Sequence, residues 1–263
     1  MRGCAKKFLF AAPLAAGLIA LAASPARAEK LVTSVSSHRV LITSNFTGTE
    51  LVLFGTIEEA PANAQIGKYD IVITVRGPAR SYVTREKERV LGLWVNAESR
   101  DFTRVPSYLA VMTNRPPVEM GPPDFLHKNR IGLANHIFAQ QIGPDIADVT
   151  HDDPFRAAFL RVKEDEGAYI TNTSGVTFLT PRLFRAAVPI LGTALTGNYE
   201  IETLLLANST VLAKQQTAFE VVKTGFEAFV AREARRHGLY YGLAVAFLAI
   251  VAGLIANLLF RRE

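Results

Sequence analysis

Short apolar runs divided by turn residues make up most of the chain. Segments rich in valine, isoleucine, threonine and aromatic residues recur from Leu31 to Met112 and again from Ala168 to Lys223. This spacing is typical of antiparallel strands that bury one face and end at glycine, proline or asparagine. We expect strands at 31–36, 39–44, 50–57, 69–76, 80–85, 88–96 and 106–113, and further strands at 168–171, 176–179, 183–190, 197–206 and 216–223.

The two β regions, 29–115 and 167–223, predict a mainly β fold with an immunoglobulin-like sandwich. Two architectures fit: two small sandwiches, or one sandwich whose strands come from both regions. The number of strands is large for one sandwich of immunoglobulin size, which slightly favours two. Gly197-Asn198-Tyr199 resembles the start of a strand with a tyrosine corner, in which the tyrosine hydroxyl binds the backbone a few residues upstream.

Residues 116–166 separate the two β regions and predict a proline-rich linker with a helical segment. Arg115–Pro123 contains four prolines, which cannot donate to a sheet, so the first β region should end there. Asp124 can cap a helix that runs to about Gln141. The dipeptide Asp153-Pro154 is typical of a second helix start.

The N-terminus has the order of residues found in a secretory signal peptide. A basic start precedes the apolar stretch Phe8–Ala22, and the small-residue triplet Ala26-Arg27-Ala28 follows it. This stretch is shorter than the roughly 20 residues that span a bilayer. We therefore expect residues 1–28 to be a cleaved signal peptide rather than a membrane anchor.

A second apolar segment, Leu239–Phe260, contains 22 consecutive residues without a charge. It is long enough to cross a bilayer, so we expect a transmembrane helix at 239–260. A juxtamembrane helix at 224–238 should precede it, because Thr224 and Glu227 form a capping box. Since the signal peptide would export the domain, the prediction is a single-pass inner-membrane protein with a periplasmic N-terminal domain and a cytoplasmic tail, 261–263.

Charge and cysteine content exclude several classes of protein. The net charge is +5, but four basic residues lie in the predicted signal peptide and the remainder carries +1. A nearly neutral domain has no broad positive field for nucleic acid. Cys4 is the single cysteine, so neither a disulfide nor a cysteine zinc site fits the exported chain.

The sequence offers little basis for an enzyme. It has no nucleophile elbow, phosphate loop, dinucleotide loop or zinc-protease helix. Thr150-His151-Asp152-Asp153 combines an imidazole with two carboxylates, but neighbouring side chains rarely point at one ion and Asp153 fits a helix cap. We therefore expect no catalytic residue, no cofactor and no metal site. In an alternative reading, Arg76, Arg80 or His151 would bind an anion or a metal.

Two features predict contacts with a partner. Trp94 is the only tryptophan, and with Phe102 or Tyr108 it could form an exposed aromatic platform. Such residues more often pack in a core, and the alternation in Arg89–Asn96 predicts one buried face. In the span, small residues form one narrow stripe: Gly242, Ala246, Ala249, Gly253 and Ala256. A stripe of this kind lets helices approach closely, so it predicts self-association or binding to a larger membrane protein, with a plain anchor as the alternative.

Short motifs spread over most of the mature chain carry a family resemblance. They are Val75-Arg76-Gly77-Pro78, Gly92-Leu93-Trp94-Val95-Asn96, Pro106-Ser107-Tyr108, Phe184-Arg185-Ala186 with Pro189, Gly197-Asn198-Tyr199, and Phe219–Glu227 leading into Tyr241-Gly242. With them the chain resembles the alphaproteobacterial "putative transmembrane protein" family. The resemblance implies a signal peptide, a β-rich outer region and one C-terminal span, with no established activity or catalytic residue. It also implies an accessory role beside exporters of the sulfite or sulfonate type.

These observations lead to two functional hypotheses. The first is a non-enzymatic accessory to a membrane transporter, with the lipid bilayer and a transporter or a second copy as partners, and no nucleic acid. The second is a periplasmic ligand- or metal-binding module anchored to the membrane.

Overall fold

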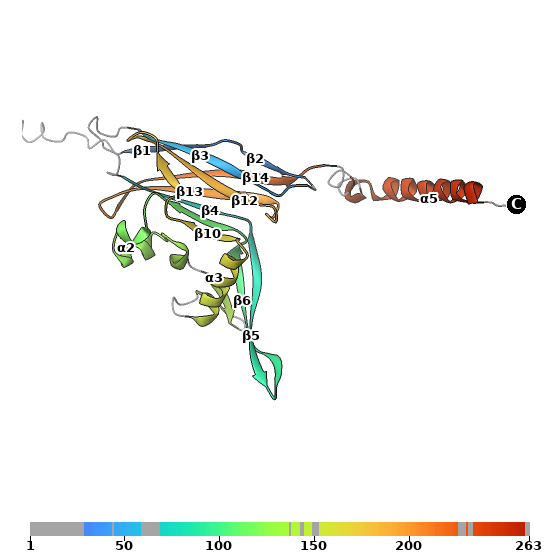
Figure 1. Ribbon diagram of the computed structural model, residues 1–263, viewed down its shortest axis with the longest axis horizontal. Helices are drawn as coiled ribbons and strands as arrows, with labels where there is room; N and C mark the ends of the chain where they lie inside the picture. The colour runs from blue at the N-terminus through green and yellow to red at the C-terminus, as the bar shows by residue number, and fades with distance from the viewer. Residues whose placement is uncertain are drawn as a thin grey trace, which may run out of the picture.

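The computed structural model describes residues 29–43, 45–58, 69–136, 138–142, 145–148, 153–225, 230 and 234–260. The predicted signal peptide, residues 226–229 and 231–233 of the predicted juxtamembrane helix, and the tail lie outside these residues. The described chain is mainly β, as the sequence predicts (Figure 1).

The described strands form three sheets. The first sheet has the order β1 (Lys30–Val35), β3 (Gly48–Glu58), β12 (Leu183–Leu191) and β11 (Val176–Phe178). The second has the order β10 (Tyr169–Asn172), β7 (Leu109–Thr113), β4 (Asp70–Arg76), β13 (Gly197–Ala207), β14 (Thr210–Lys223) and β2 (Arg39–Ile42). The third has the order β5 (Ala79–Val90), β6 (Leu93–Pro106), β8 (Ala139–Ile142) and β9 (Asp145–Asp148).

The first two sheets share one apolar core. Leu53 and Phe184 from the first sheet are fully buried in the same cluster as Ile73 and Tyr199 from the second. Close packing at this core explains Gly55 on β3, because a Cβ there would lie 2.1 Å from the Phe184 ring. Both β regions contribute strands to each of these sheets, which is the arrangement of the single-sandwich alternative.

A second apolar cluster covers the other face of the second sheet. There Val72 of β4 and Val111 of β7 share a cluster with Phe159 of helix α3 (Pro154–Asp165). Strand β4 is therefore buried on both faces, which explains its continuous apolar sequence. Helix α3 begins as predicted, because the Asp153 carboxylate accepts hydrogen bonds from the backbone N–H groups of Phe155 and Arg156.

Three sequence predictions about local structure are wrong. The predicted strand 88–96 contains a turn instead, at Leu91-Gly92 between β5 and β6. No face of Arg89–Asn96 is buried, because residues 85–99 are all exposed. The predicted helix 124–141 is only the short helix α2 (Pro123–Lys128), followed by the 3-10 helix η2 (Leu133–Asn135) and β8.

The helix at Asp124 ends early for a backbone reason. Arg130 has φ 54° and Gly132 has φ 92°, and both values are incompatible with a right-handed helix. Leu126 and Leu133, two of the apolar side chains that suggested helical spacing, are buried in the second cluster, whereas the third, Ile137, lies outside the described residues. Tertiary packing therefore explains their spacing.

Helix α5 (Gly238–Phe260) is the C-terminal element of the described chain. Gly238–Asn257 is long and apolar enough to cross a membrane, and none of its apolar window is buried against the described residues. The small-residue stripe lies on this helix. Apart from the helix's own backbone, no atom of the described residues lies within 4 Å of the position that a Cβ would take on Gly242 or Gly253.

Candidate functional site

The β5–β6 hairpin projects away from the two-sheet body (Figure 1). Strand β8 pairs with β6 only at Asp101–Thr103, so the hairpin beyond Asp101 has no further strand partner among the described residues. Side chains 85–99 are all exposed. The outer half of the hairpin therefore contributes nothing to either apolar core.

The end of the hairpin is a tight turn with an unusual residue. Leu91 and Gly92 have φ of 50° and 85°, which matches the two positive φ values of a type I′ turn between the paired residues Val90 and Leu93. Asparagine or glycine normally fills the first position, because a branched apolar side chain is strained there. Leu91 is nevertheless in this position, and 99% of it is exposed.

Leu91 belongs to a small apolar group, which we call the hairpin tip: Val90, Leu91, Leu93, Trp94 and Val95. Leu93 is 71% exposed and Trp94 69% exposed. The predicted companions of Trp94 do not join it, because Phe102 and Tyr108 are buried at 0% and 3% exposure. Trp94 is thus an exposed aromatic residue, but its neighbours are aliphatic.

Charges of both signs follow the hairpin tip. Trp94 pairs across the hairpin with Arg89, and Val95 pairs with Glu88, so each apolar side chain shares a face with a charge. Arg85, Glu86, Lys87, Glu88, Arg89 and Glu98 contain equal numbers of basic and acidic residues. The hairpin tip therefore has almost no net electrostatic field of its own.

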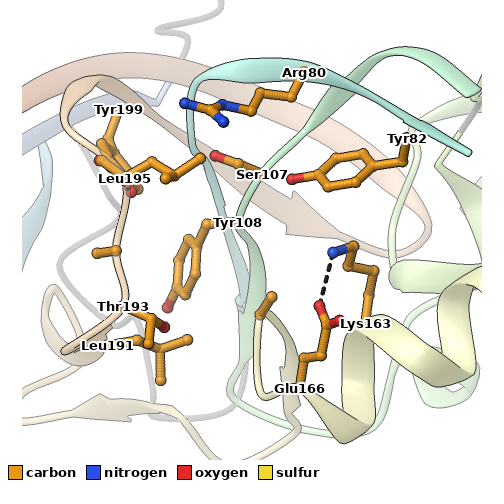
Figure 2. A pocket seen from close by; sticks show the side chains of 12 residues that line it. Arg80, Tyr82, Ser107, Tyr108, Lys163, Glu166, Leu191, Thr193, Leu195 and Tyr199 are labelled. Carbon is orange, nitrogen blue, oxygen red and sulfur yellow. Dashed lines mark hydrogen bonds and ion pairs between the residues drawn. The ribbon is translucent and has the colours of Figure 1, made fainter.

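A cavity of about 460 Å³ lies at the base of the same hairpin. Its wall combines β5, the segment after β6, the end of α3 and the loop between β12 and β13 (Figure 2). The polar lining residues that matter here are Arg80, Tyr82, Ser107, Lys163 and Glu166. The volume is within the range of small-molecule sites in proteins.

Two cations and one carboxylate line this cavity. The Lys163 side chain is 10% exposed, and its Nζ lies 2.7 Å from Glu166 Oε2 and 4.1 Å from the centre of the Tyr82 ring. The Arg80 residue is exposed, and no described residue forms a hydrogen bond or ion pair with its guanidinium. Ser107 Oγ is buried and also lacks a hydrogen-bond partner in the described chain.

Two tyrosines form the opposite wall and have structural roles. Tyr108 donates a hydrogen bond to Pro189 O at 2.5 Å, and Tyr199 donates to Leu195 O at 2.9 Å. Burial raises the pKa of Tyr199 to about 12 and raises that of Tyr108 further. Both hydroxyls therefore stay protonated, and the Tyr199 bond to a residue four positions upstream matches the predicted tyrosine corner.

The sequence-predicted binding residues do not come together. Arg80 lines the cavity, whereas Arg76 binds Glu202 at 3.2 Å on another strand pair. His151 lies outside the described residues. Among the described residues no three His, Cys, Asp or Glu side chains form a group that could hold a metal. Sequence reasoning missed Lys163 and Ser107, because their meeting depends on α3 packing beside the hairpin.

A β-rich domain followed by one apolar helix of spanning length defines a membrane protein with one candidate span. The chain belongs to the family described as "Putative transmembrane protein (Alph_Pro_TM)", whose model matches residues 30–262. No curated protein matches the chain.

Among solved structures, the chain is similar to the N-terminal domain of the Streptococcus gordonii adhesin Sgo0707, with 8% identity and a TM-score of 0.23. The match covers 73% of this chain and 32% of that chain, so this chain spans about a third of the adhesin domain's length. A similarity at this level carries no argument about fold or function.

Proposed function

We propose that this protein is a non-enzymatic accessory subunit whose hairpin tip binds an integral membrane protein, with a transporter as the class that the family resemblance implies. The observation that carries the proposal is Leu91, an apolar side chain that is 99% exposed at a backbone position where leucine is strained. Leu91 belongs to neither apolar cluster, which supports a role in binding.

The composition of the hairpin tip favours a protein partner. Tryptophan and leucine surrounded by polar residues are typical anchors of protein interfaces. A hairpin that inserted into anionic lipid would be expected to carry excess basic charge, whereas the charges behind this tip cancel. Trp94 and Leu91 would instead fill an apolar pocket, while Arg89 and Glu88 would pair with charges at its rim.

Helix α5 supports a partner in the same membrane. An anchored domain samples neighbouring membrane proteins at a high effective concentration, which strengthens a small contact. The stripe Gly242, Ala246, Ala249, Gly253 and Ala256 would supply a second contact with the partner's helices. We further propose an inner-membrane location with the hairpin in the periplasm, as the N-terminal sequence predicts.

Photocrosslinking tests the partner directly. A photoreactive phenylalanine analogue replaces Trp94 in the full chain, and a control carries it at Val118, which is 79% exposed away from the hairpin. We expect a position-94 adduct with one identified integral membrane protein, recovered reciprocally when that protein is purified. In co-purification without a crosslinker, Trp94→Ala should lower recovery of the same membrane protein about tenfold or more, as loss of an anchor does.

Three outcomes would contradict the proposal. They are adducts with lipid alone, adducts with a second copy of this chain alone, and recovery that is the same for Trp94→Ala and the natural chain. Adducts that form equally from positions 94 and 118 would show collision rather than binding and would also count against it.

A further inference from the structure

We propose that the cavity at the base of the hairpin binds a small carboxylic acid, with its carboxylate against Arg80 and its apolar body against the two tyrosines. This is a separate site from the hairpin tip and does not depend on the accessory function. Figure 2 shows Arg80, Ser107 and Tyr82 with their polar ends directed toward one shared space.

The unused donors determine the charge of the ligand. The Arg80 guanidinium has five N–H donors, none of which binds a described residue, and Arg80 lines the cavity from an exposed position. Lys163 is nine-tenths buried, and only one of its three donors is used, by Glu166. With Glu166 counted, the cavity wall has a net charge of +1, which a monoanion neutralises.

Ser107 supplies independent evidence for a polar ligand. Ser107 is 9% exposed and is one of the residues that line the cavity, and its Oγ is buried without a hydrogen-bond partner in the described chain. A buried hydroxyl without a partner is costly, so such atoms usually mark a place where a ligand or water binds. A carboxylate oxygen held by Arg80 would accept the hydrogen bond from Ser107.

The shape of the donors and the remaining wall define the rest of the ligand. A guanidinium is planar and matches the two oxygens of a carboxylate with paired hydrogen bonds. The tyrosine side of the cavity is mostly apolar, since both hydroxyls bind backbone carbonyls and Leu191, Ala194 and Leu195 line the cavity with Thr193. A carboxylate with an aromatic or short aliphatic body satisfies both halves.

Calorimetry on the full chain in lipid nanodiscs tests this site with benzoate as the probe. Benzamide has the same shape without the charge, and acetate has the charge without the apolar body. We expect both to bind about tenfold more weakly than benzoate, since each removes one half of the recognition. Benzoate should also raise the unfolding temperature of the domain.

Matched variants locate the site. Arg80→Gln should weaken benzoate about tenfold, whereas Arg85→Gln, on the same strand beyond the cavity, should leave the affinity unchanged. Ser107→Ala should weaken it by a smaller factor, about threefold. Trp94→Ala, which tests the hairpin tip, should have no effect, so each proposal can fail without the other.

The carboxylate site would be overturned by any of three results. The first is that benzamide binds as tightly as benzoate. The second is that Arg80→Gln leaves the benzoate affinity unchanged, as Arg85→Gln should. The third is that no carboxylate in a series from acetate to phenylpropionate binds at millimolar concentration.

Discussion

At the scale of single residues, His136 links the stability of the β-rich domain to pH. The residue is 6% exposed, and its Nε2 has no hydrogen-bond partner among the described residues. Burial and the nearby charges of Arg76, Arg130 and Arg156 lower its pKa to about 4, and Glu202 opposes them only in part. His136 is therefore neutral in the folded protein at pH 7.

The pKa of His136 predicts a loss of stability in mild acid. Between about pH 6.5 and 4 the unfolded chain binds a proton at this histidine and the folded chain does not, so the free energy of unfolding falls as the pH falls. The full effect is about 3 kcal/mol at a pKa shift of this size. Thermal unfolding at pH 7 and pH 5 should show a smaller pH dependence in His136→Gln than in the natural chain, and an equal dependence would refute this assignment.

Individual elements show how far the sequence determines the structure. The β-rich pattern and the start of α3 follow from local chemistry, because strand alternation and the Asp153 cap are encoded within a few residues. The prediction of a strand across 88–96 was wrong because a turn that begins with an apolar residue, such as Leu91-Gly92, lacks the usual turn residues. Alternation could not show that both faces of this segment are exposed, since that depends on where neighbouring sheets end.

The cavity lay beyond sequence analysis for a similar reason. Arg80 was identified as an anion-binding candidate because of its charge, but the residues around it come from three other parts of the chain. Lys163 in α3 has polar neighbours in the sequence, which gave no indication of a binding role. In the fold its side chain is buried against Tyr82 and Phe159 instead.

The β5–β6 turn predicts a conflict between stability and binding. Asparagine tolerates the positive φ of Leu91, so Leu91→Asn should leave the unfolding free energy unchanged or raise it by up to about 1 kcal/mol. The same change removes the most exposed apolar group of the hairpin tip, so recovery of the membrane partner should fall. Thermal unfolding and reciprocal purification measure the two effects, with Val118→Asn as the exposed control. A lower unfolding temperature for Leu91→Asn would show that Leu91 stabilises the fold.

At the scale of the whole molecule, the two candidate sites occupy opposite ends of one hairpin. The hairpin tip is at the free end, and the cavity is where β5 and β6 join the two-sheet body beside α3 (Figures 1 and 2). Two antiparallel strands of 12 and 14 residues connect these ends. They pair along their length, and the register shifts at two points. A partner at the tip and a ligand at the base would therefore contact the same element.

The proposed periplasmic location of the hairpin tip is tested by membrane topology. Cys4 lies in the predicted signal peptide, so Val118→Cys would give the mature chain a single cysteine on an exposed surface. A membrane-impermeant maleimide should label it in cells with a permeabilised outer membrane, because export should carry the domain across before the apolar segment at 239–260 halts it. A reporter enzyme that works only in the cytoplasm should be active when it is fused after Glu263, and a reporter that works only in the periplasm should be inactive there. Labelling that requires disruption of the inner membrane would place the hairpin tip on the cytoplasmic side and exclude a periplasmic surface of the partner.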